Sequence, residues 1–300
     1  MALNHFDVII IGGSYGGLSA AMALGRSLRN VLIIDNNQPC NRFTPHSHNF
    51  LTHDGDTPEQ IKSLALTQVK RYSTINFYDG FAASVKNTSG GFEVSASDNS
   101  VFISSKIILA AGIKDIMPDI KGFAECWGRT VIHCPYCHGY EYKDKKTGIL
   151  ANGEAGYHYV KLVSNLTKDI VLFTNGKAEF TQDQLSRIRK HNIPIIETGI
   201  IELDHTNGIL NNVRLDNGSV IPLTALYNIP AFEHHSDITK QLKCEMTDNG
   251  LIKVDELQRT SIPGVFACGD NSNKRAVSVA VASGTLAGTS VNNELAEELF

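Results

Sequence analysis

A strand, a glycine-rich turn, a helix and a second strand follow one another at the start of the chain. Residues 7–11 form an unbroken apolar run, residues 12–17 read GGSYGG, and residues 18–28 predict a helix. A second apolar run at residues 31–34 ends in Asp35. This order is typical of a dinucleotide-binding unit, in which the turn presents a helix N-terminus to the phosphates of the ligand. We therefore predict an α/β fold.

The same order recurs near the middle of the chain. Residues 147–150 predict a strand, residues 151–156 a turn, residues 157–166 a helix and residues 170–173 another strand. Short strands are expected after each copy, at residues 92–96, 101–103 and 106–109, in the hairpin-rich stretch 200–221 and near Leu226. A length of 300 residues suits two domains of about 150 residues each. The sequence predicts two nested dinucleotide-binding domains, Rossmann-like with three ββα layers, the second inserted into the first.

The first glycine-rich turn has the features that a pyrophosphate requires. Gly12 allows a tight exit from the strand, the small Ser14 lets the backbone approach the phosphates, and Gly17 lets helix and strand pack closely. Asp35 has the spacing of the acidic residue that accepts hydrogen bonds from ribose hydroxyls. A glycine turn alone also occurs in other α/β folds, but the strand, the helix and Asp35 in register favour a dinucleotide. The turn residues assigned to the cofactor are Gly12, Gly13, Ser14, Tyr15, Gly16 and Gly17.

Cys134 and Cys137 form a CPYC motif far downstream of this turn. Two thiols at this spacing can cycle between dithiol and disulfide, and the dipole at a helix start lowers a thiol pKa. The motif alone fits equally well half of a zinc site or two buried cysteines. Zinc could draw on Cys126, His133 or His138, but a second CxxC or HxxxH is missing, and no metal is predicted. Four cysteines are expected to be free thiols: Cys40, Cys126, Cys244 and Cys268.

Charge and composition limit the partners and the location. The formal net charge is −4 and the Lys and Arg residues are scattered, so neither nucleic acid nor an anionic membrane is an expected partner. The first residues lack a basic segment followed by an apolar run. The longest stretch of small apolar residues, 276–288, is too short and too rich in Ser and Gly to cross a bilayer. We expect a cytoplasmic protein.

Taken together, these features resemble the low-molecular-weight thioredoxin reductase family over nearly the whole chain. The glycine-rich turn with its acidic residue, the CPYC pair, the nested second unit and a Gly-Asp near the C-terminus carry the resemblance. The CHGYE continuation at residues 137–141 and the small-residue tail are similar to a branch that includes FAD dithiol oxidases of gliotoxin-type and holomycin-type pathways. The family implies FAD, a homodimer and a dithiol that exchanges electrons with the flavin. By position, it assigns these further residues to cofactor binding: Asn41, Ala111, Gly112, Gly269, Asp270, Val277 and Ser278.

Departures from the reductase pattern argue against a nicotinamide cofactor. The second turn begins with Ala151 where a reductase has glycine, and Glu154 places a negative charge beside a would-be phosphate. Residues 174–177 read TNGK and offer neither an acidic residue for the ribose of NADH nor an arginine pair for the 2′-phosphate of NADPH. An Arg-Gln pair of the family is replaced by Val277 and Ser278. NADPH is therefore a doubtful cofactor.

His138 stands where reductases of the family place an aspartate as acid catalyst. An imidazole with a pKa of about 6.5 can take a proton from a thiol and stabilise the thiolate that is left behind. The alternative is a histidine that only caps the local helix. The resemblance further implies that Cys137 lies nearer the flavin and that Cys134 exchanges with the substrate.

These observations lead us to expect an FAD-dependent thiol/disulfide oxidoreductase that cycles Cys134 and Cys137 against the flavin. It would oxidise a small or protein dithiol with oxygen or another non-nicotinamide acceptor. One alternative is an NADPH-dependent thioredoxin-disulfide reductase with a thioredoxin-like partner, and another is a non-enzymatic flavin- or zinc-binding redox sensor. The expected domains are an FAD-binding domain of residues 1–115 and 246–300 and an NAD(P)-binding-like domain of residues 116–245 that carries the CPYC motif.

Overall fold

The computed structural model describes residues 5–300, which divide into two compact units. Unit 1 comprises the described chain up to Arg42, Glu59–Lys114 and Phe232–Phe300. Unit 2 comprises Phe43–Pro58 and Asp115–Ala231. The chain thus returns to unit 1 at Phe232, ahead of the expected residue 246, because α7 (Ile238–Gln241) buries Ile238 in the core of unit 1.

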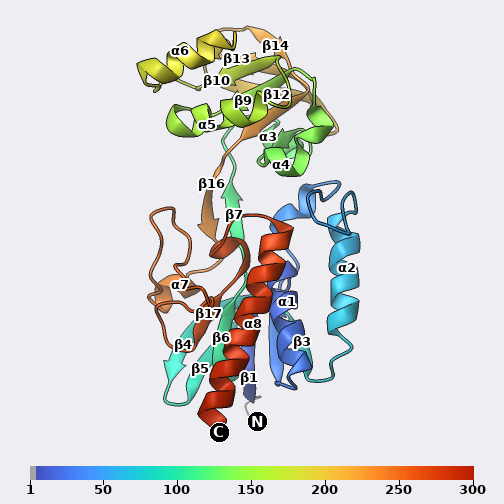
Figure 1. Cartoon of the computed structure of the whole chain (residues 1–300), viewed down its shortest axis with the longest axis vertical. Helices are drawn as coiled ribbons and strands as arrows, with labels where there is room; N and C mark the ends of the chain where they lie inside the picture. The colour runs from blue at the N-terminus through green and yellow to red at the C-terminus, as the bar shows by residue number, and fades with distance from the viewer. Residues whose placement is uncertain (1–4) are drawn as a thin grey trace. The chain divides into compact units, whose positions relative to one another are not determined.

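Unit 1 is built on a seven-stranded sheet. Its strands run in the order β3 (Ile75–Asp79), β2 (Val31–Asp35), β1 (His5–Ile11), β6 (Val101–Leu109), β5 (Gly91–Ala96) and β4 (Ala82–Thr88), with β17 (Val265–Ala267) on β6. The strand β1 is parallel to both of its neighbours and its apolar residues are buried on both faces, as a continuous hydrophobic run requires. Helix α1 (Tyr15–Arg26) packs against α8 (Val277–Leu299), and α2 (Pro58–Val69) also belongs to this unit (Figure 1).

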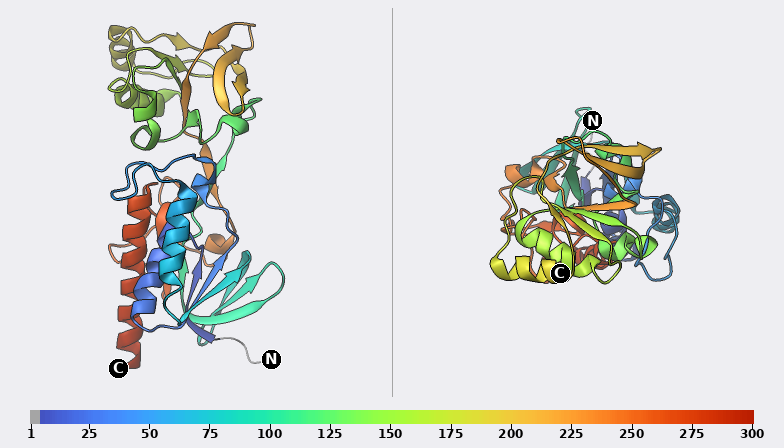
Figure 2. Two further views of the ribbon diagram at one scale, coloured as in Figure 1. Left: turned by 90° about the vertical axis from the view of Figure 1, so that its right-hand side faces the viewer. Right: turned by 90° about the horizontal axis from the view of Figure 1, so that it is seen from above.

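Unit 2 repeats this plan with a smaller central sheet. A five-stranded parallel sheet has the order β11 (Ile195–Ile196), β10 (Ile170–Phe173), β9 (Thr147–Leu150), β15 (Ala225–Asn228) and β8 (Val131–Ile132). A three-stranded antiparallel sheet follows, with β12 (Ile200–Thr206), β13 (Ile209–Leu215) and β14 (Val220–Pro222). Helices α5 (Gly153–Val163) and α6 (Gln182–Lys190) belong to the same unit (Figure 2). The predicted fold of two nested Rossmann-like domains is confirmed.

The two passages of the chain between the units are paired. Strand β7 (Ile113–Ile116) leads out of unit 1 and β16 (Ala231–His234) leads back, and the two form a two-stranded sheet. None of the helices between residues 5 and 300 combines membrane-spanning length with sufficient apolar character.

Two helices and one strand have bounds that differ from those expected from the sequence. Helix α1 begins at Tyr15 and α5 begins at Gly153, each a few residues earlier than expected, because the glycine-rich turns themselves form the first turn of the helix. Strand β6 is continuous, where two short strands were expected. Its N-terminal half pairs with β5 and its C-terminal half pairs with β17, so both halves have hydrogen-bonding partners.

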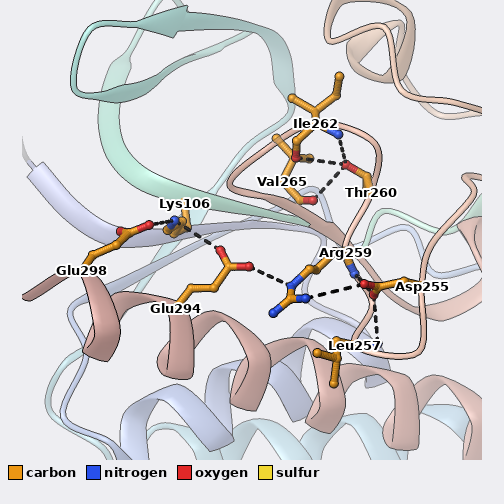
Figure 3. Close-up of polar contacts among 9 residues, drawn as sticks. All are labelled: Lys106, Asp255, Leu257, Arg259, Thr260, Ile262, Val265, Glu294 and Glu298. Carbon is orange, nitrogen blue, oxygen red and sulfur yellow. Dashed lines mark hydrogen bonds and ion pairs between the residues drawn. The ribbon is translucent and has the colours of Figure 1, made fainter.

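The long helix α8 is fixed to unit 1 near both of its ends. Towards its N-terminus, a side chain at Gly284 would collide with the backbone of Gly16 in α1, so the two helices approach closely. Towards its C-terminus, Lys106 of β6 donates to Glu294 (3.3 Å) and to Glu298 (2.5 Å), as Figure 3 shows. Arg259 also donates to Glu294 (2.8 Å). The side chain of Lys106 is 8% exposed, so these carboxylates compensate a buried charge.

Candidate functional site

The first glycine-rich turn lies tightly against the end of β6. Gly12 has φ +109°, and a side chain there would collide with the carbonyl of Ala110. A Cβ at Gly12 would also approach Cα of Ala111 to 2.8 Å, which places Ala111 beside the turn. A side chain at Gly17 would collide with the carbonyl of Gly12. Only glycine satisfies these positions, as predicted for a turn that brings helix and strand together.

The N-cap side chain of α1 does not cap the helix. The Ser14 side chain makes no capping hydrogen bond to any of residues 5–300, and the first turn holds no acidic residue. Beside it, a Cβ on Gly13 would lie 2.9 Å from Oδ2 of Asp35, which ends β2. A helix start without a capping bond from its N-cap side chain, next to a carboxylate at a strand end, suits the pyrophosphate and the ribose of a dinucleotide.

Asp35 has a cationic partner that the sequence did not reveal. Nζ of Lys62 in α2 donates to Oδ2 of Asp35 (3.0 Å) and to Oδ1 of Asn37 (2.7 Å). The segment that carries Lys62 has no glycine-rich turn or binding motif, and only tertiary packing brings Lys62 to the end of β2. Close by in sequence, Asn41 donates to the hydroxyl of Tyr15 (3.3 Å), so two predicted cofactor residues meet.

Segments from the C-terminal part of unit 1 also meet the first glycine-rich turn. Gly269 has φ +79°, and its N–H donates to Oγ of Ser283 (3.0 Å). A Cβ on Gly16 would lie 3.4 Å from both the amide nitrogen of Gly269 and the carbonyl oxygen of Ala280, so these segments meet at the first turn. Asp270 follows in a short 3-10 helix, and Val277 and Ser278 form the first turn of α8. Gly112, with φ +70°, has open space at its Cβ position.

Unit 1 therefore brings the first glycine-rich turn together with Asp35, Ala111 and Gly269. Side chains at Gly12 and Gly17 would collide with the backbone, Ser14 leaves the start of α1 without a capping bond from its own side chain, and Asp35 lies beside Gly13. These features fit a dinucleotide such as FAD, with its pyrophosphate at the start of α1 and its ribose at Asp35.

The CPYC motif forms a disulfide between Cys134 and Cys137 in unit 2, with their Cα atoms 5.2 Å apart. Cys134 caps the single-turn helix α4 (Pro135–His138), and its carbonyl accepts from the N–H of His138 (3.1 Å). Pro135 suits the first helical position because its missing N–H has no partner there. The helix dipole is weaker than the sequence argument assumed, because the dipole sums over peptide units and this helix has only one turn.

His138 is half-buried next to the disulfide. Burial lowers the pKa of His138, the carboxylate of Glu141 raises it, and His48 lowers it. The rings of His138 and His48 meet edge to face with their centroids 6.3 Å apart. The lowered pKa favours the neutral imidazole, the form that can accept a proton from a thiol. The carbonyl of His133 accepts from the hydroxyl of Tyr159 (2.7 Å), a structural contact.

His48 was missed by the sequence reasoning. It lies in the segment Phe43–Pro58, which interrupts unit 1 in sequence but packs with unit 2. Its Nε2 is 3.5 Å from Oε1 of Glu141, and its Nδ1 is 3.5 Å from Oδ1 of Asp54. The histidine-rich composition of this segment was the one available signal, but it gave no indication that His48 would lie beside His138.

The second glycine-rich turn is occupied by side chains of its own unit. Oδ1 of Asn152 accepts from the backbone N–H of Gly153 and from that of Glu179, both at 2.9 Å. The side-chain Nδ2 of Asn152 donates to the backbone carbonyl of Lys177 (2.8 Å). Glu154, in the first turn of α5, accepts from Gln184 (2.6 Å). The start of α5 is thus capped and negatively charged, unlike the start of α1.

The other cysteines lie outside the disulfide. Cys126, Cys244 and Cys268 are buried free thiols, and burial raises the pKa of each, that of Cys268 to about 12. Cys40 is half-buried and its Sγ accepts from Arg275 (2.8 Å). Among residues 5–300, no three His, Cys, Asp or Glu side chains are grouped so that they could hold a metal ion.

Comparison with known proteins gives a consistent result. A family model described as pyridine nucleotide-disulphide oxidoreductase matches residues 6–284. The thioredoxin reductase sirT of Leptosphaeria maculans is 33% identical over 306 residues, covering 96% of this chain and 93% of its own length. The oxidoreductase from Agrobacterium tumefaciens has a similar structure, with a TM-score of 0.90 at 36% identity over 97% of this chain and 98% of that one. HlmI has a TM-score of 0.92 at 30% identity over 98% of this chain and 93% of its own.

Proposed function

Because this chain belongs to the thioredoxin reductase-like flavoproteins of the pyridine nucleotide-disulphide oxidoreductase family, we propose that it oxidises a dithiol without a nicotinamide. The chain is an FAD-dependent oxidoreductase acting on sulfur groups. The proposed electron path runs from the substrate dithiol through Cys134 and Cys137 to the flavin, and from there to oxygen or another non-nicotinamide acceptor.

The contrast between the two glycine-rich turns carries this proposal. At the first turn, the side chain of Ser14 makes no capping hydrogen bond to the start of α1, and Asp35 lies beside Gly13. At the second turn, Asn152 already occupies the N–H of Gly153, and Glu154 adds a negative charge. Hydrogen bonds to charged phosphates contribute about 1.5–3 kcal/mol each, so losing them weakens dinucleotide binding strongly. The structure of unit 2 therefore supports dithiol oxidation over NADPH-driven reduction.

Thiol–disulfide exchange between the substrate dithiol and the Cys134–Cys137 disulfide is the first part of the proposed reaction. A substrate thiolate attacks Sγ of Cys134, the Cys134–Cys137 bond breaks, and Cys137 leaves as a thiolate. The second substrate thiol gives its proton to neutral His138 and attacks the mixed disulfide, which releases the substrate as a disulfide and Cys134 as a thiolate. When bound, FAD supplies the two-electron acceptor that returns the cysteine pair to its disulfide form.

The second candidate is an NADPH-dependent thioredoxin-disulfide reductase. The names of the relatives favour it, since sirT of Leptosphaeria maculans and aclD of Aspergillus oryzae are both called thioredoxin reductases. It would require the second turn to open, because Asn152 and Glu154 occupy the start of α5. A homodimeric, cytoplasmic protein with a small-molecule or thioredoxin-like dithiol partner remains part of the proposal for either function.

Steady-state oxygen uptake tests the proposed function. The FAD-loaded protein is mixed in air with dithiothreitol, and oxygen consumption and hydrogen peroxide are followed together. We expect one peroxide for each dithiol oxidised, and no stimulation by NADPH. Oxygen uptake no faster than that of free FAD, together with NADPH-dependent reduction of a thioredoxin disulfide, would establish the reductase instead.

A further inference from the structure

His48 is held in place by a compact loop. The N–H of Ser47 donates to the carbonyl of Asp56, and the N–H of Gly55 donates to the carbonyl of Ser47, each at 2.8 Å. Within this loop, Oδ1 of Asp54 accepts from the backbone N–H of Asn49 (2.8 Å) and lies 3.5 Å from Nδ1 of His48. Asp54 is therefore fixed by the backbone at one side of the imidazole.

The opposite side of the His48 ring meets the redox motif. Its Nε2 lies 3.5 Å from Glu141, and its ring lies against that of His138. Two carboxylates thus flank His48, whereas burial disfavours a charge on His138. The titratable groups around the two rings are Glu141 after α4 and Asp54 and His46 in the loop, and the Cys134–Cys137 disulfide adjoins His138.

We propose that His48 is a positioning residue for His138: it engages the Glu141 carboxylate and borders the imidazole, so that His138 remains neutral and ready to accept a thiol proton. This inference rests on the proposed dithiol oxidation, in which His138 is the base. It adds a residue from a distant segment to the centre that the CPYC motif defines. His48 acts through His138 and does not itself contact the disulfide in this account.

The charges around His138 predict the direction in which each substitution should shift its pKa. Glu141 raises the pKa of His138 and His48 lowers it. Replacing His48 with Phe keeps an aromatic ring but removes the imidazole that lowers the pKa of His138, and it releases Glu141, so the pKa of His138 should rise. Replacing Glu141 with Gln should lower it. Because the base must be neutral, a raised pKa moves the acid limb of the rate to higher pH, and a lowered pKa moves it to lower pH.

The test uses the FAD-loaded protein with isotopically labelled histidine. The pKa of His138 is measured by NMR titration, and the rate of dithiothreitol oxidation is measured across pH in parallel. For His48→Phe, we expect both the NMR pKa and the acid limb to rise by on the order of half a pH unit, with FAD content unchanged. For Glu141→Gln, both should fall. The matched control is His46→Phe in the same loop, since the ring of His46 lies 6.4 Å from His48 and its Nδ1 contacts the carbonyl of Gly55 (2.9 Å).

Two results would overturn the inference. One is an unchanged His138 pKa in His48→Phe, and the other is a shift of the same sign in His48→Phe and Glu141→Gln. If His48→Phe fails to fold or loses FAD, His48→Gln carries the same expectation, because it also removes the imidazole. The NMR titration reports on His138 whichever electron acceptor the enzyme uses. A wild-type enzyme that fails to oxidise dithiols therefore refutes the proposed function, and the titration alone decides the role of His48.

Discussion

The side chain of Asn152 accepts a hydrogen bond from the backbone N–H of Glu179 at 2.9 Å, which joins the start of α5 to the loop after β10. In a dinucleotide-binding domain these two segments border the ligand, one at the pyrophosphate and the other at the adenosine ribose. Here they bind each other. Unit 2 thus keeps the topology of a dinucleotide-binding domain, and its Asn152 side chain links the start of α5 to the loop after β10.

The cofactor site predicts a specific effect of removing Asp35. Asp35→Ala should weaken FAD retention by about 1.5–3 kcal/mol, because a carboxylate that accepts ribose hydrogen bonds is lost. FAD dissociation is measured by flavin fluorescence after dilution. The matched control is Asp79→Ala, since Asp79 pairs with Asp35 in register at the end of the neighbouring strand β3 and is exposed. Equal FAD retention in Asp35→Ala and Asp79→Ala would show that the adenosine site lies elsewhere.

The two cysteines should differ in role. If Cys137 is the thiol nearer the flavin, Cys134→Ser leaves a Cys137 thiolate that produces long-wavelength absorbance with bound FAD, and Cys137→Ser does not. Absorbance spectra of the two purified variants check this. Cys126→Ser, at a buried free thiol, should match the wild type. Indistinguishable spectra for Cys134→Ser and Cys137→Ser would contradict the assignment of Cys137 as the thiol nearer the flavin.

His138 should govern thiolate formation. In the reduced enzyme, a neutral imidazole beside the cysteine pair takes up the thiol proton, so His138→Ala should raise the pH at which the thiolate appears. The pH dependence of alkylation by iodoacetamide measures this. His133→Ala is the control, because His133 makes its contact with Tyr159 through the backbone carbonyl. If the thiolate forms at the same pH in His138→Ala and in the wild type, His138 does not accept the thiol proton and only caps the local helix.

The charge network in Figure 3 predicts a stability effect remote from the site. Lys106→Met should lower the free energy of unfolding by about 1–3 kcal/mol, because Glu294 and Glu298 lose a buried partner. Lys86→Met is the comparison, since Lys86 is 72% exposed and its pair with Glu93 spans 3.8 Å. An exposed pair of this kind contributes about 0–1 kcal/mol. Urea unfolding measures both, and equal losses would show that burial of Lys106 does not strengthen its ion pairs.

The features that the sequence could predict are local. The strands, the glycine-rich turns and the CPYC pair follow from the order and spacing of neighbouring residues, and the nested fold follows from their repetition. Ala151 and Glu154 also indicate, from the sequence alone, weakened dinucleotide binding at the second turn. The bonds that Asn152 makes with Lys177 and Glu179 were not predictable, because they depend on the path of the loop after β10.

The missed residues share a physical reason. Lys62 reaches Asp35, and His48 reaches His138, across long separations in sequence. Neither contact leaves a periodic pattern or a spacing motif, since each depends on where α2 or the segment Phe43–Pro58 packs in the folded chain. From the sequence alone, Lys62 and His48 are therefore only polar residues whose partners cannot be predicted.

Anaerobic stopped-flow absorbance of the flavin tests the central claim most directly. The oxidised, FAD-loaded protein is mixed in turn with dithiothreitol, NADPH and NADH, each at the same micromolar concentration. We predict that the dithiol bleaches the flavin far faster than either nicotinamide, because the start of α5 is occupied by Asn152 and carries Glu154. Rapid, stoichiometric bleaching by NADPH would contradict this account and identify the protein as a reductase.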